Sequence, residues 1–225
     1  EMEEFERQIP SALAAGATPR EVLEVILQAT VYVGYLKAGR GARLCIKVLE
    51  GLGRLDEITG TQLPLDGRAS ERTLDEERQR WPAAKSAEEA ALREQLIEKY
   101  GWHGVSTRIR TQSHQGYDSI KCFDRTDPQY LKLWFDFIYG ELYTRGIVDD
   151  RTRLLVMVGI CLAVNEPIQL ENHMRGALLF GATAREVMEV IVNSTAYVGM
   201  PTTILTCRVL ERIAKEENRL AELTP

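Results

Sequence analysis

The segment GATPREVLEVI at residues 16–26 returns as GATAREVMEVI at residues 181–191. The similarity extends over residues 16–34 and 181–199, where 13 of 19 positions are identical without a gap. Unrelated segments of this length would share about one position, so a fixed repeat is present. The chain therefore contains two copies of one unit, 165 residues apart.

The repeated segment predicts a helix that ends at a glycine and a second helix that begins shortly after it. Gly16 and Gly181 each follow an apolar helical pattern, where glycine can adopt the left-handed conformation that ends a helix. Thr18 and Thr183 stand at N-cap positions, each with a glutamate three residues later, which is the capping-box spacing. Each copy is therefore expected to contain a helix, a glycine stop and a capped helix.

The second copy is nearly complete, and almost no strand pattern occurs anywhere, so the predicted fold class is all-α. We expect helices at about 127–145, 149–164, 167–180, 184–199 and 201–217. The first copy begins inside the counterpart of the third of these helices. By the offset, its first helices would precede Glu1, and the missing initial Met also predicts an upstream segment.

The copies divide the chain into three predicted parts. Residues 1–55 form a partial first copy, residues 56–125 a polar connector and residues 126–217 the second copy. Within the connector we expect a helix at 86–100. Turn residues and aromatics then mix without a period, and residues 101–118 are a candidate lid, because long irregular segments often cover binding sites.

Composition limits the classes of function. The 225 residues carry a net charge of −5, and a mildly acidic chain argues against a nucleic-acid or membrane partner, both of which favour a basic face. The longest apolar run, Leu154–Val164, is shorter than the about 20 residues of a bilayer span, and no signal peptide is recognisable. The isolated cysteines predict reduced thiols in the cytoplasm and no metal site. They are Cys45, Cys122, Cys161 and Cys207.

Five motifs in the second copy carry a family resemblance. They are Tyr139–Arg145 (YGELYTR), Asp150–Leu155 (DRTRLL), Glu171–Leu178 (ENHMRGAL), Gly181–Val187 (GATAREV) and Ala196–Pro201 (AYVGMP). Their order and spacing resemble the γ-carboxymuconolactone decarboxylase family, and residues 6–50 look like the second half of the same unit.

The resemblance implies an all-helical unit that assembles as dimers and as rings of three dimers. Two tandem alkylhydroperoxidase-like units would form an intramolecular pseudo-dimer, and we expect a homo-oligomer, a trimer of pseudo-dimers. The family's decarboxylation uses no metal and no organic cofactor, so the expected partner is a small-molecule substrate alone.

A peroxidase function is disfavoured. The sister alkylhydroperoxidase branch uses a Cys-x-x-Cys pair whose second cysteine lies four residues before a histidine. Counting back from His173, the two positions hold Glu166 and Gln169, and the branch's glutamate after Arg153 is replaced by Leu154. Thiol peroxidation needs a low-pKa thiolate and a resolving partner, and neither stands at these positions.

His173 is the first candidate catalytic residue. Helical spacing places it at one edge of an apolar stripe, about 60° from Leu170, so we predict a half-buried imidazole at the boundary of a pocket. Asn172 and Gly176 are expected to face away. An imidazole titrates near neutrality and can donate or accept a proton there, although a structural core histidine is the alternative.

Glu141 is the second candidate. It continues an apolar stripe made by Tyr130, Trp134, Phe137 and Ile138. A carboxylate in such a stripe is costly unless it is paired or protonated. It would either work beside His173 with a raised pKa or form a structural ion pair with Arg153 or Arg175.

Weaker candidates for substrate binding complete the predicted site. Glu171 and Arg175, four residues apart on the stripe edge opposite His173, either form an ordinary helix pair or bind a substrate carboxylate. His103, His114 and Tyr117 lie in the candidate lid, where exposed loop histidines are the alternative.

The copies differ at the central position, because the offset places Gln8 opposite His173 and Glu6 opposite Glu171. Glutamine cannot act as an acid or base near neutral pH. We therefore predict that the first copy has lost its catalytic centre and completes the pocket of the second.

The leading hypothesis is a cofactor-independent decarboxylase acting on a carboxylated lactone or β-keto acid through an enolate, with His173 as acid or electrophile. The alternative is an isomerase or cyclase of secondary metabolism, which would use the same groups without loss of CO2. A hypothesis of another class is a non-catalytic helical oligomer or binding protein.

Overall fold

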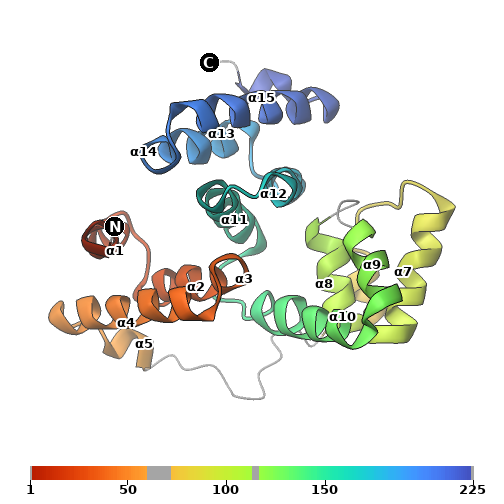
Figure 1. The fold of residues 1–225 in the computed structure, drawn as a ribbon, viewed down its shortest axis with the longest axis horizontal. Helices are drawn as coiled ribbons and strands as arrows, with labels where there is room; N and C mark the ends of the chain where they lie inside the picture. The colour runs from red at the N-terminus through yellow and green to blue at the C-terminus, as the bar shows by residue number, and fades with distance from the viewer. Residues whose placement is uncertain (1, 60–71, 113–116, 224–225) are drawn as a thin grey trace. The chain divides into compact units, whose positions relative to one another are not determined.

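The computed structural model describes residues 2–59, 72–112 and 117–223 (Figure 1). Every regular element in these ranges is a helix, which confirms the all-α prediction. The helices are α1 (Met2–Ala14), α2 (Pro19–Gln28), α3 (Thr30–Val33), α4 (Tyr35–Gly51), α5 (Asp56–Thr59), α6 (Leu74–Arg78), α7 (Ala87–Tyr100), α8 (Trp102–Gln112), α9 (Tyr117–Thr126), α10 (Pro128–Trp134), the π-helix η1 (Phe135–Leu142), α11 (Asp150–Val164), α12 (Pro167–Leu179), α13 (Ala184–Asn193), α14 (Thr195–Val198), α15 (Met200–Glu216) and the 3₁₀-helix η2 (Leu220–Leu223).

The chain divides into two compact units. Unit 1 comprises Glu1–Gly67 and Arg145–Asp149, and unit 2 comprises Arg68–Thr144 and Asp150–Pro225. In unit 1, α2 lies beside α4 (Figure 1), and the guanidinium of Arg145 donates to the buried carboxylate of Glu24 at 2.8 Å. The core of this unit consists of Ile9, Leu23, Ile26, Cys45, Leu49 and Ile58.

The two copies of the repeat share their helix bounds residue for residue. Adding 165 to the bounds of α1, α2, α3 and α4 gives those of α12, α13, α14 and α15. Thr18 and Thr183 each form the predicted capping box with the glutamate three residues later. Gly16 and Gly181 have φ angles of 104° and 86°, the left-handed region that ends the preceding helix. The predicted arrangement of helix, glycine stop and capped helix is therefore confirmed in both copies.

The predicted helix at 127–145 consists of two elements, α10 and the π-helix η1. Its buried line runs through Leu131, Phe135 and Tyr139, whereas Tyr130 and Phe137 are 50% and 53% exposed. A π-helix closes its hydrogen bonds five residues back, and its wider turn keeps residues four apart in line. Of the predicted stripe, Trp134 and Ile138 pack against the core, whereas Tyr130 and Phe137 do not, so the predicted stripe is half correct.

The connector is more ordered than the sequence indicated. The predicted helix at 86–100 is confirmed as α7, with Ser86 as its N-cap. The expectation of irregular structure over residues 101–118 is wrong in the described part of that segment, because α8 occupies residues 102–112. Every residue of α8 from 104 to 112 is buried against its neighbours, which include η1, α7 and α12. A helix covered on all sides has no solvent face, so its sequence shows no amphipathic period.

Helices α11 and α12 run side by side in unit 2 and form its centre (Figure 1). Leu154, Met157, Val158 and Cys161 on α11 are fully buried. Helix α12 is also in contact with α8, α13 and α15, so it packs against four helices of this unit. Within the described ranges, no helix has the length and apolar character needed to cross a bilayer.

Candidate functional site

His173 lies on α12 and is fully buried, with Met174 beside it also fully buried. The prediction of a half-buried ring is wrong, because α8 covers the side of α12 that the sequence pattern left to solvent. Asn172 and Gly176, which were expected to face away from the core, are buried for the same reason. Burial disfavours the charged imidazolium and lowers the pKa of His173 to about 3, so the ring is neutral near pH 7.

Gln112 is the polar neighbour of His173 on α8. Its amide Nε2 lies 3.3 Å from Nδ1 of the imidazole, and both side chains are buried. The helices approach closely at this point because Gly176 has no side chain. A Cβ atom there would lie 2.7 Å from the backbone oxygen of Thr111. The glycine of the ENHMRGAL motif therefore allows α8 to reach the histidine.

Buried ion pairs hold α8 in place from its other side. Arg110 on α8 pairs with Asp150 at the start of α11 and with Glu77 of α6, the latter at 3.5 Å. Glu77 also accepts from Arg80 at 2.9 Å. A buried ion pair left with one partner is strongly destabilising, so this cluster ties α6, α8 and α11 together.

Glu171 and Arg175 form the predicted helix pair, with Arg175 Nη2 2.9 Å from a Glu171 carboxylate oxygen. Arg212 of α15 also donates to Glu171 at 2.6 Å, and Arg175 reaches Glu216. Hydrogen bonds from Arg212 and Arg175 lower the pKa of Glu171. Glu171 and Arg175 face α15, whereas His173 faces α8, so the two stripe edges are opposite one another as predicted.

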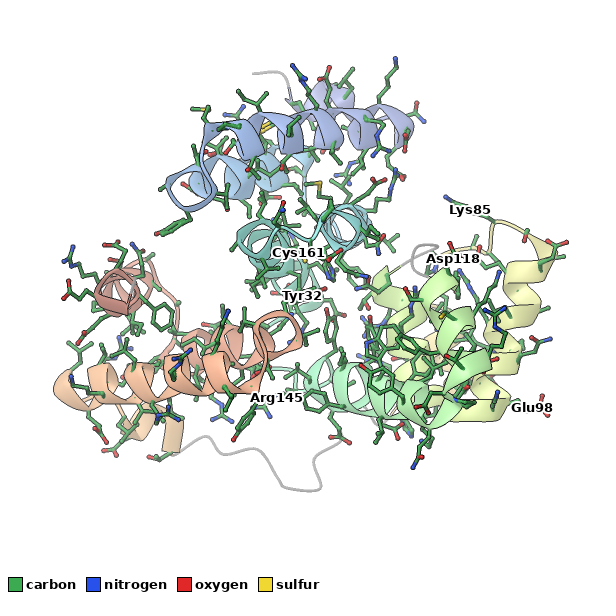
Figure 2. The ribbon with its side chains drawn as sticks, in the orientation of Figure 1. Tyr32, Lys85, Glu98, Asp118, Arg145 and Cys161 are labelled. Atoms are coloured by element: carbon green, nitrogen blue, oxygen red, sulfur yellow. The ribbon has the colours of Figure 1, made fainter. Side chains whose placement is uncertain are left out.

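A pocket of about 260 Å³ opens on the α15 side of α12. Cys161, labelled in Figure 2, lies on α11 at this pocket, and Glu171 lies at it on α12. His173 is not among the lining residues. The full lining is Cys161, Leu162, Asn165, Glu166, Pro167, Leu170, Glu171, Thr202, Leu205, Thr206 and Val209.

Glu141 does not continue a buried stripe. Its side chain is exposed at the end of η1, four residues after the exposed Phe137, and therefore on the same outer face. The structure gives its carboxylate no ion pair within the described ranges, so the expected pairs with Arg153 and Arg175 are not formed. The prediction that Glu141 is a pocket carboxylate beside His173 is therefore wrong in its placement.

The predicted site residues of the connector make separate contacts. The His103 ring, at the start of α8, stacks on Trp102 with ring centroids 3.8 Å apart. Tyr117 is buried at the start of α9, where its hydroxyl accepts from Nε of Arg93 at 3.2 Å. Its ring also lies under the guanidinium of Arg108. His114 falls outside the described residues.

Sequence analysis missed several polar residues that contact predicted site residues, among them Gln112 and Arg212. No period marked α8 as a helix, so nothing singled out Gln112. Arg212 carried a usable signal, because it lies on the predicted 201–217 helix beside the 167–180 helix.

For metals, the described part of the chain contains no group of three or more His, Cys, Asp or Glu residues that could hold an ion.

Comparison with known proteins matches part of unit 2. A model of the carboxymuconolactone decarboxylase family matches residues 128–212, from α10 into α15. The chain is 29% identical over 114 residues to the 4-carboxymuconolactone decarboxylase of Acinetobacter baylyi, covering 50% of this chain and 83% of that protein.

Two further relatives are shorter matches. An uncharacterised 15.0 kDa protein of Paracoccus denitrificans is 33% identical over 91 residues, which are 39% of this chain and 64% of that protein. The nitrosuccinic acid decarboxylase of Metarhizium robertsii is 27% identical over 82 residues, 36% of this chain and 55% of that protein. The chain thus spans less than two thirds of these two relatives. The similarity to the carboxymuconolactone decarboxylase family thus covers residues 128–212, from α10 into α15.

Proposed function

We propose that this protein is a decarboxylase that removes CO2 from a carboxylated lactone or a β-keto acid through an enolate. The observation that carries the proposal is the chemistry shared by two relatives. They are named for different acids, carboxymuconolactone and nitrosuccinic acid, yet both are named as decarboxylases. Loss of CO2 from an activated acid is therefore the reaction class that the similarity supports.

In the proposed reaction, the bond between the carboxylate carbon and the adjacent carbon breaks, and its electron pair forms an enolate. A proton then replaces the lost carboxyl group. His173 is neutral near pH 7, so it can donate an N–H hydrogen bond to the enolate oxygen without bringing a positive charge into the interior. Because the ring is fully buried, this mechanism requires the packing around Nε2 to open when substrate binds, while α8 keeps Gln112 against Nδ1.

The opposite side of α12 offers an alternative position for an acid substrate. Arg175 and Arg212 pair with Glu171, which lines the 260 Å³ pocket, and a guanidinium pairs with a carboxylate through two parallel hydrogen bonds. Because these groups face α15 and His173 faces α8, a substrate carboxylate bound here would not lie beside His173. No cofactor enters the proposed scheme.

The test is incubation of the purified chain with γ-lactone acids and β-keto acids in D2O, with CO2 release and deuterium uptake measured together. We expect CO2 from at least one acid. His173→Gln should lower kcat by about 100-fold, the size of a typical acid–base contribution. Arg175→Ala, on the opposite side of α12, should leave kcat and KM little changed, as should the control Arg185→Ala on the surface of α13.

Deuterium uptake without CO2 would replace the decarboxylase by an isomerase or cyclase. Loss of activity in Arg175→Ala but not in His173→Gln would move the chemistry to the pocket at α15.

The complete burial of His173 favours a second candidate, a non-catalytic helical binding protein. A catalytic imidazole must reach its substrate, and this ring is packed under α8. Neither CO2 nor deuterium uptake with any acid would support this candidate.

We also propose that the protein is a homo-oligomer. Tyr197, Met200, Ile204 and Leu205 on α14 and α15 are 64%, 58%, 46% and 61% exposed, and an apolar surface of this kind is typical of an interface. Light scattering after size-exclusion chromatography tests this, and a monomer at micromolar concentration would contradict it.

A further inference from the structure

The contact between Gln112 and His173 joins two parts of the chain with different relationships to the family. His173 lies within the family-matched segment 128–212, whereas Gln112 lies on α8, outside it. The separation of 3.3 Å joins Gln112 Nε2 to His173 Nδ1, and both residues are at most 2% exposed. The polar environment of the histidine is therefore set in part by an element outside that segment.

The chemistry of the two atoms determines where the imidazole proton lies. An amide Nε2 carries two hydrogens and can only donate, so its partner Nδ1 must accept. A neutral imidazole has one acceptor nitrogen and one N–H, and the hydrogen bond at one nitrogen selects the tautomer. With Nδ1 as acceptor, the proton is on Nε2.

Contacts of the residues that precede Gln112 hold this part of α8 against α12. Gly176 brings α12 against Thr111, the residue before Gln112. One residue before Thr111, Arg110 is anchored by Asp150 and Glu77. Thr111 donates its hydroxyl to the backbone oxygen of Thr107 at 2.8 Å, within α8. The part of α8 that precedes Gln112 is thus held by its neighbours.

We propose that Gln112 is a positioning residue that holds His173 in the tautomer with the proton on Nε2. This role in catalysis rests on the proposed function, because the Nε2–H is the group that would meet the enolate oxygen. The tautomer itself does not depend on any activity.

The first experiment reads the tautomer directly by NMR of the full chain labelled with ¹⁵N-histidine at pH 7. The chain has three histidines, and His173→Gln identifies the signals of His173. We expect Nε2 protonated and Nδ1 unprotonated. In Gln112→Glu the carboxylate accepts instead of donating, so the proton should move to Nδ1. Gln112→Met keeps the size but removes the donor and should give a mixture of tautomers.

Gln129→Glu, an exposed glutamine on α10, is the matched control and should leave the His173 signals unchanged. A proton on Nδ1 in the unmodified chain would overturn the inference, even if a variant failed to fold. Unchanged His173 signals in folded Gln112→Glu and Gln112→Met would also overturn it.

The second experiment measures turnover. With an active substrate, Gln112→Glu should lower kcat by about 100-fold with KM little changed, since the acid loses its correct proton. Gln112→Met should lower kcat by a smaller factor, because part of the population keeps the proton on Nε2. Unchanged kcat in a variant with the altered tautomer would overturn the positioning role. If no acid releases CO2 but the tautomers behave as expected, the proposed function fails while the assignment of the tautomer stands.

Discussion

Replacing Gly176 by alanine tests the close packing that brings α8 to His173. The new Cβ would lie 2.7 Å from the backbone oxygen of Thr111 and 3.2 Å from Cδ2 of Leu154. Ordinary contact begins at 3.4 Å, so the backbone of α8 must retreat by about 0.7 Å (3.4 less 2.7). A backbone atom in a buried helix cannot rotate away as a side chain can.

The expected magnitude is a balance of two effects. Overpacking a core costs about 1–3 kcal/mol, whereas alanine in a helix interior gains up to about 1 kcal/mol over glycine. We expect a net loss of about 1–2 kcal/mol for Gly176→Ala. Gly159→Ala on α11 is the matched control, because its Cβ would meet only Val190 Cγ1 at 3.7 Å. That control should gain about 0.5–1 kcal/mol.

Chemical unfolding and thermal melts of both variants provide the measurement. For a chain of this size, 1 kcal/mol corresponds to about 2–4 °C in Tm. The two alanine variants should therefore differ by roughly 4–8 °C, with the unmodified chain between them. Equal shifts in the same direction would refute the close contact between α8 and α12.

Three further expectations follow from the structure. Burial lowers the pKa of His173 from 6.5 to about 3. As the pH falls below about 6.5, the unfolded chain therefore takes up this proton before the folded chain does, and the folded chain loses stability. Between about pH 6.5 and 5.5, the unmodified chain should lose about 1 kcal/mol more unfolding free energy than His173→Gln, as read by urea titration. Arg110→Ala should lower the free energy of unfolding by about 3 kcal/mol, because it leaves Asp150 without its nearest cation. The control Arg185→Ala should lower it by less than about 0.5 kcal/mol. Similar losses for both variants would contradict a stabilising role of the ion pairs of Arg110. Gln8→Ala should leave turnover largely intact, while His173→Ala should remove it. Equal losses of turnover would refute the prediction that the first copy has lost its catalytic centre.

Local signals predicted the repeat correctly because each depends on a few neighbouring residues. The capping boxes at Thr18 and Thr183 and the glycine stops at residues 16 and 181 are decided within one helical turn. The opposite orientation of His173 and Glu171 on α12 likewise follows from helical geometry alone. Such features require no knowledge of what packs against the helix.

The burial of His173 and the exposure of Glu141 were both predicted wrongly. Sequence spacing cannot show that α8 covers α12, because α8 is polar and has no period of its own. His173 therefore seemed to border solvent. Glu141 was misplaced because the prediction took Tyr130 and Phe137 as buried, whereas both lie on the exposed face that Glu141 continues. In both cases, tertiary contacts decided burial.

The covering helix also accounts for the asymmetry of the two copies. By the offset, the counterparts of His173 and Gly176 are Gln8 and Ser11, both exposed on α1. Ser11 carries a Cβ at the position where α8 needs none, and Gln8 turns to Glu4, to which its amide donates at 2.9 Å. A helix like α8 could not approach α1 as it approaches α12. The histidine and the glycine that admits its covering helix thus occur together in the second copy and are absent together from the first, which is the pattern expected if they serve one site.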